Sequence, residues 1–226
     1  MPNDSLRRIS LKDLADNPSN RLPVVLCLDI SGSMKGDPIR ELNAGIRLFI
    51  QAVREDPFAS ASVELLVVTF ADKAKLETDF MAVDSIQWAE ATATGGHTDL
   101  GGGVILSLDK LNERKNLYQT LGIDYFQPWL VLMTDGIPTT ETHRTASVRT
   151  LELEGAGKLT VFPIGIGDKA NLTVLKNFSK KNDPLRLGGL KFREFFQWLS
   201  RSVAVVSASR PGEKTKLPPI TGWTEV

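Results

Sequence analysis

The chain has 226 residues, of which 42% are hydrophobic and 24% charged, an ordinary composition for one sizeable globular domain. Its 27 basic residues balance 27 acidic ones without a basic cluster, so electrostatic binding to nucleic acid or to an anionic membrane is not indicated. The lone cysteine, Cys27, excludes an intrachain disulfide. The start resembles no secretory signal and no apolar run is long enough for a membrane span, so we expect a cytoplasmic protein.

The first third of the chain opens with a polar segment and then alternates strand and helix patterns. The expected organisation is a leader arm over 1–20, one domain over 21–206 and a C-terminal tail or arm over 207–226. The apolar run 22–28, which ends in the carboxylate of Asp29, predicts a buried strand over 22–29. A helix is expected to follow, with Asp37 as its N-cap and Pro38 at its first position, and to end at Asp56-Pro57.

The rest of the chain continues this alternation. Further buried strands are predicted over 63–70, 129–134 and 158–166, weaker strands over 75–81 and 185–187, and helices over 100–116, 143–154, 171–180 and 192–206. The last helix is strongly apolar and is expected in the core; the alternative is a helix that docks a partner, and Trp198 is the residue expected at such an interface. Together these elements predict an α/β fold: a doubly wound, mostly parallel, Rossmann-like sheet flanked by helices, with one short antiparallel edge strand at 75–81.

The segment Asp29-x-Ser31-x-Ser33 directly follows the first buried strand. In open α/β sheets, ligands bind at the carboxyl ends of the strands, which is where this segment is predicted to lie. The same residues also suit a simpler role, the capping of the next helix. The motif alone does not decide between the two.

Two other polar positions are expected at the same edge of the sheet. Thr98 ends a Gly-Gly-His-Thr loop, and Asp135 follows the strand 129–134. With Asp29, Ser31 and Ser33 they would supply two carboxylates and three hydroxyls. Such oxygen ligands suit hard divalent cations: Mg²⁺ is expected, with Mn²⁺ or Ca²⁺ as alternatives.

The order and spacing of these five residues resemble the metal-ion-dependent adhesion site (MIDAS) of von Willebrand factor A domains. The resemblance covers about residues 22–206 and is closest to the bacterial TerY/YegL-type proteins of tellurium-resistance and stress loci. Its motifs are Leu28-Asp29-Ile30-Ser31-Gly32-Ser33-Met34, Pro38-Ile39-x-Glu41-Leu42-Asn43, Glu113-Arg114-Lys115, Pro128-Trp129, Thr134-Asp135-Gly136-x-Pro138-Thr139 and Gly222-Trp223. It implies that Ser31, Ser33 and sometimes Thr98 bind the metal directly, and that Asp29 and Asp135 act partly through water.

This resemblance implies a metal-dependent protein-binding module rather than an enzyme, with an Asp or Glu of a partner protein completing the metal shell. Phosphatase- or kinase-like proteins of the same locus are the implied partners. Asp99 departs from the family pattern, where an uncharged residue is usual; it is expected either to face solvent or to add negative charge near the metal. His97 is expected to be an ordinary loop residue.

The enzyme alternative is a metal-dependent phosphotransferase or phosphatase of the haloacid-dehalogenase type. That chemistry needs a nucleophilic Asp and an acid–base Asp two residues later, where this chain has Ser31. With only two histidines and no Gly-x-Ser-x-Gly motif, a Ser-His-Asp hydrolase is not expected.

Overall fold

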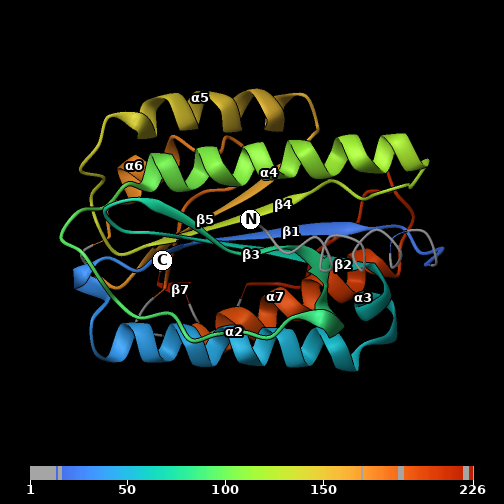
Figure 1. The fold of residues 1–226 in the computed structure, drawn as a ribbon, viewed down its shortest axis with the longest axis horizontal. Coiled ribbons are helices and arrows are strands. Elements are labelled where there is room, and N and C mark those ends of the chain that lie inside the picture. The colour runs from blue at the N-terminus through green and yellow to red at the C-terminus, as the bar shows by residue number, and fades with distance from the viewer. Residues whose placement is uncertain (1–13, 15–16, 169, 188–190, 221–223, 226) are drawn as a thin grey trace, which may run out of the picture.

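A seven-stranded sheet forms the centre of the molecule (Figure 1). The computed structural model describes residue 14 and residues 17–168, 170–187, 191–220 and 224–225. The strand order is β3-β2-β1-β4-β5-β6-β7. The strands are β1 (Leu22–Asp29), β2 (Val63–Phe70), β3 (Ala74–Ala82), β4 (Trp129–Thr134), β5 (Thr160–Ile166), β6 (Leu185–Leu187) and β7 (Thr224–Glu225).

The predicted α/β architecture is confirmed: β2, β1, β4, β5 and β6 run parallel, and β3 pairs antiparallel at one edge. At nine residues, β3 is longer than expected. The structure adds a second antiparallel strand, β7, which pairs with β6 at the opposite edge and comes from the predicted tail. Most of the predicted leader arm, and Gly222-Trp223, lie outside the described residues.

Helices cover both faces of the sheet. In Figure 1, α4, α5 and α6 lie on one face, and α2, α3 and α7 on the other. Their bounds are α2 (Asp37–Glu55), α3 (Pro57–Ser62), α4 (Leu100–Leu121), α5 (Thr142–Gly155), α6 (Leu172–Lys176) and α7 (Phe192–Ser207), with 3₁₀ turns η1 (Gly32–Met34) and η2 (Val83–Ser85). Among the described residues, no helix combines the length and apolar character needed to span a bilayer.

Several helix boundaries differ from the sequence predictions. The helix α4 continues to Leu121, beyond the predicted end at 116, and α6 ends at Lys176, short of the predicted end at 180. Gly36, with a φ of 94°, is the N-cap of α2; Asp37 is already helical and pairs with Arg40, so Pro38 is one position further in. The sequence predicted only the end of α2 at Asp56-Pro57, but a second short helix, α3, follows there. It is capped by the Asp56 carboxylate, which accepts a hydrogen bond from the backbone N–H of Ala59 (2.8 Å).

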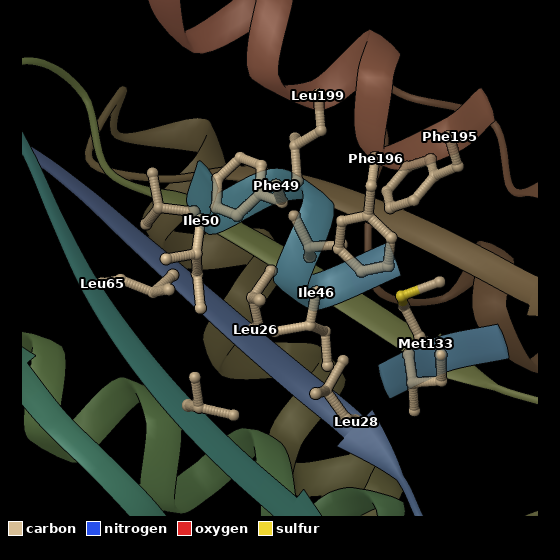
Figure 2. Packing of buried hydrophobic residues seen from close by; sticks show 14 of the residues in the cluster. Leu26, Leu28, Ile46, Phe49, Ile50, Leu65, Met133, Phe195, Phe196 and Leu199 are labelled. Atoms are coloured by element: carbon tan, nitrogen blue, oxygen red, sulfur yellow. The ribbon is translucent and has the colours of Figure 1, made fainter. Parts of the chain in front are cut away.

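The core consists of two apolar layers, one on each face of the sheet. Because side chains alternate along a strand, Leu26 and Leu28 of β1 face α2 and α7, whereas Cys27 faces α4. Figure 2 shows the first layer, where Phe49 of α2 lies close to Phe196 of α7, with a ring-centroid distance of 6.1 Å. The predicted burial of α7 is confirmed. The expectation that Trp198 is the interfacial residue of this helix is wrong: its side chain is 2% exposed, and its indole N–H donates to the Pro218 carbonyl (2.9 Å) of the C-terminal segment.

Candidate metal site

Asp29 is the last residue of β1, and its buried carboxylate links two neighbouring strands. The backbone N–H of Ser31 donates to Oδ1 (2.8 Å), which fixes the turn that follows the strand. The hydroxyl of Thr134, the last residue of β4, donates to Oδ2 (2.5 Å). Because Leu28 pairs with Met133 in the parallel register, the next residue of each strand is a neighbour at the same sheet edge. The sheet therefore holds Asp29 in a defined orientation.

Ser31 is the N-cap of the turn η1 and Ser33 lies within it, and both reach toward the loop after β4. The hydroxyls of Ser31 and Ser33 lie 3.2 Å apart, and the Ser33 hydroxyl donates to Oδ1 of Asp135 (2.8 Å). Ser31 is 3% exposed, whereas Ser33 is exposed and Asp135 is half-buried. The cluster thus runs from the sheet edge out to the surface.

Thr98 reaches the same place from the long connection between β3 and α4. Its backbone N–H donates to the hydroxyl of Thr139 (3.0 Å), and its carbonyl accepts from the N–H of Thr139 (3.1 Å). A Cβ on Gly136 would lie 3.4 Å from the Thr98 hydroxyl and 3.8 Å from Oδ2 of Asp29, so this glycine sits directly between the two. The three loops predicted from sequence therefore bring all five predicted side chains together.

The chemistry of this donor set fits a hard divalent cation. All five side chains offer oxygen, and no group of three or more His, Cys, Asp or Glu that could hold a metal occurs among the described residues, so a soft-metal site is not indicated there. Burial raises the pKa of Asp29, and the nearby Asp135 carboxylate raises it further, against the lowering effect of the hydrogen bonds from Ser31 and Thr134. Burial also raises the pKa of Asp135. A bound cation would offset both unfavourable effects.

Asp99 has neither of the two roles expected from sequence. Its Oδ1 accepts hydrogen bonds from the N–H of Gly102 (3.1 Å) and from the hydroxyls of Thr140 and Thr142 (both 2.9 Å). It is the N-cap of α4 and joins the Thr98 loop to the segment after β4. Its negative charge is therefore used by the helix end and not directed at the five-residue cluster.

The structure adds two residues that sequence reasoning did not assign to the site. Thr134 orients Asp29, and Asp72, in the turn between β2 and β3, accepts backbone hydrogen bonds from Gly96 (3.0 Å) and His97 (2.9 Å). The His97 side chain is exposed. Thr134 could have been noticed as the residue before Asp135 at a strand end; nothing in the sequence links Asp72 to a loop 24 residues away.

A family model of the von Willebrand factor type A domain matches residues 24–192. This chain belongs to the von Willebrand factor type A domain family. The match starts within β1 and ends at the beginning of α7, so it spans every loop of the five-residue cluster.

Solved structures share the fold of this A domain at low sequence identity. The pilus adhesin SpaC from Lactobacillus rhamnosus GG is 12% identical with a TM-score of 0.68, over 83% of this chain and 31% of that one. A von Willebrand factor type A structure from Catenulispora acidiphila is 16% identical with a TM-score of 0.57, over 83% and 43%. Proximal thread matrix protein 1 from the mussel byssus, with a zinc-occupied MIDAS motif, is 16% identical with a TM-score of 0.57, over 84% and 47%. The chain spans less than half the length of each of these proteins.

Proposed function

We propose that this A domain is a metal-dependent protein-binding module whose metal is held by Asp29, Ser31, Ser33, Thr98 and Asp135. The observation that carries the proposal is the convergence of two carboxylates and three hydroxyls from three loops, with Ser33 bonded to Asp135 across the cluster. The gradation from buried Asp29 to exposed Ser33 leaves the metal reachable from solvent. A site of this kind can bind a surface group of another protein.

An acidic residue is the partner group that we propose. Hydroxyls are neutral ligands, so a dication held mainly by Ser31, Ser33 and Thr98 keeps much of its charge. One Asp or Glu oxygen from the partner would then complete an octahedral shell through a charge-assisted contact. Mg²⁺ is the proposed native metal, with Mn²⁺ or Ca²⁺ as alternatives; the zinc in the mussel protein's MIDAS shows that this fold can also hold zinc.

A binding role is favoured over catalysis by the side chain at position 31. A phosphotransferase of the haloacid-dehalogenase type needs a proton-carrying carboxylic acid there. Ser31 instead hydrogen-bonds Ser33 within the cluster. We therefore propose that the protein is not an enzyme.

The finer biological setting rests on the resemblance to the TerY/YegL-type proteins. We propose a bacterial role in tellurium resistance, stress response or signalling, with phosphatase- or kinase-like partners. A cytoplasmic location is part of this proposal, and the free, buried thiol of Cys27 is compatible with a reducing compartment.

The test is the double variant Ser31→Ala with Ser33→Ala. Titration calorimetry with Mg²⁺ and Mn²⁺ should show binding to the wild type and none to the double variant, while both keep the same circular dichroism spectrum. Ser85→Ala, an exposed serine in η2, is the matched control and should bind as the wild type does. Unchanged metal affinity in the double variant would overturn the site assignment.

A second arm tests binding against catalysis. A partner should co-purify from the native cell in Mg²⁺, be released by EDTA and be lost with the double variant, with its identity established by mass spectrometry. Mg²⁺-dependent hydrolysis of a generic phosphate ester, abolished by Asp29→Asn, would instead support the enzyme alternative.

A further inference from the structure

Asp72 holds the glycine-rich part of the Thr98 loop in place. Its exposed carboxylate lies in the turn that follows β2, and Oδ1 accepts the backbone N–H groups of Gly96 (3.0 Å) and His97 (2.9 Å). These two hydrogen bonds lower the pKa of the Asp72 carboxyl, because they stabilise its charged form. The loop reaches Thr98 one residue after the second bond.

Gly95 is packed between Asp72 and the serine turn of the metal site. Its φ of 73° is in the left-handed region, and a Cβ on it would lie 2.7 Å from Oδ1 of Asp72. On its other side, the Gly95 carbonyl oxygen would lie 2.8 Å from a Cβ on Gly32, the residue between Ser31 and Ser33. The order Asp72, Gly95, Gly32 is thus a continuous line of close contacts from the β2–β3 turn to the proposed ligands.

The loop is tied on the far side of Thr98 by other groups. The N–H of Asp99 donates to the carbonyl of Ala71 (2.8 Å), next to Asp72, and Thr98 itself bonds Thr139. On the near side, the backbone N–H of Thr94 donates to the Ile30 carbonyl (2.8 Å). Between these anchors, Gly95 and Gly96 have large conformational freedom, and the Asp72 carboxylate is what restrains it.

We propose that Asp72 is a positioning residue of the metal site: it fixes Gly95–His97 over the serine turn without binding the metal. This inference rests on the proposed metal-binding function. Without the Asp72 carboxylate, the loop would sample other conformations. The Thr98 hydroxyl and the Ser31–Ser33 turn would then be aligned only part of the time. Outer residues that orient metal ligands typically contribute a factor of about 10–100 to metal affinity.

Three variants separate hydrogen bonding from charge. Asp72→Ala removes the acceptor and the charge, and Asp72→Asn keeps an acceptor oxygen but not the charge. Asp168→Ala serves as the charge control. The Asp168 carboxylate is exposed just beyond β5 and forms no hydrogen bond or ion pair with the described residues. Mg²⁺ and Mn²⁺ affinities are measured by titration calorimetry. Solvent exchange of the Gly96 and His97 amides is measured by NMR on the metal-free protein.

Asp72→Ala should weaken metal binding about tenfold and speed exchange of both amides, with little change in the urea midpoint of the metal-free protein. Asp72→Asn should restore slow exchange and most of the affinity, and Asp168→Ala should match the wild type. Equal losses in the alanine and asparagine variants would show an effect of charge alone and overturn the inference, as would unchanged exchange or affinity in Asp72→Ala. If the wild type binds no metal, the proposed function fails instead, while unchanged amide exchange in Asp72→Ala would still refute the restraint on the loop.

Discussion

Replacing Glu64 by alanine should destabilise the fold strongly while leaving metal binding intact. Glu64 is the second residue of β2 and is 4% exposed. Its carboxylate lies 2.7 Å from Nε of Arg114 and 3.4 Å from Nε of Arg21, and it accepts the hydroxyl of Tyr118. The Arg21 guanidinium also donates to carbonyls of the preceding segment, including Asn17 (2.7 Å). This buried cluster therefore connects the segment before β1 to the sheet.

The magnitude follows from what the substitution leaves behind. Arg21 and Arg114 are 2% and 8% exposed, so their charges would be left in a low-dielectric interior without their carboxylate. Burial is the largest influence on both pKa values: it lowers that of Arg21, whereas for Arg114 the closer hydrogen bond and charge of Glu64 prevail and the pKa is raised. Neither group loses its proton at neutral pH. Breaking such a pair from one side costs about 3–5 kcal/mol, out of about 5–15 kcal/mol for a typical domain.

Urea unfolding at pH 7 followed by circular dichroism measures this loss. Glu141→Ala is the matched control, because Glu141 lies 2.9 Å from Arg144 with both side chains more than three-quarters exposed, and exposed pairs contribute little. Metal affinity should stay at the wild-type value, because six residues of β2 separate Glu64 from the site edge, about 20 Å. A Glu64→Ala variant as stable as Glu141→Ala would refute the reasoning.

Three further substitutions or modifications test other parts of the structure. Asn43→Ala should cost about 2–3 kcal/mol in urea unfolding, because Asn43 is 4% exposed and bonds both the N–H (2.9 Å) and the carbonyl (2.8 Å) of Ala91; an unchanged stability would contradict this. Thr134→Val removes the donor to Asp29 at similar shape and should weaken Mg²⁺ binding about tenfold in calorimetry; wild-type affinity would rule out an orienting role. Burial raises the pKa of Cys27 to about 12, so a thiol reagent at pH 8 should label only the urea-unfolded protein; rapid labelling of the native protein would disprove its burial.

The strands and the position of the candidate site in the fold were predictable because both follow from local sequence. A run of apolar residues that ends in an oxygen-bearing side chain marks a buried strand and its carboxyl end, as at Asp29 and after Thr134. Parallel strands then bring such ends to one edge of the sheet. For the same reason, the burial of α7 was predictable from its apolar spacing.

The details that sequence could not give depend on contacts between distant residues. The hydrogen bonds of Asp72 to Gly96 and of Thr134 to Asp29 join positions 24 and 105 residues apart and leave no periodic pattern. The sequence allowed Asp99 to face either solvent or the metal. Its actual role follows from the hydroxyls of Thr140 and Thr142, which lie beside it in the fold but more than 40 residues away in the chain. Likewise, the indole N–H of Trp198 donates to Pro218 in a C-terminal segment whose course the sequence does not predict.

The buried carboxylates of the molecule are stabilised in different ways, and the difference supports a cation at the sheet edge. Glu64 is surrounded by two guanidinium groups, and Glu154, 1% exposed, accepts from the Ser179 hydroxyl (2.6 Å) and from the N–H of Lys180 (2.7 Å). Asp29 is as deeply buried, yet no Lys or Arg in the described part of the chain forms an ion pair with it, and Asp135 adds a second negative charge nearby. A buried charge without a counter-charge is costly, and hydrogen bonds from a backbone N–H and a hydroxyl offset only part of that cost. Binding of a dication at the proposed site would relieve the remainder of this cost.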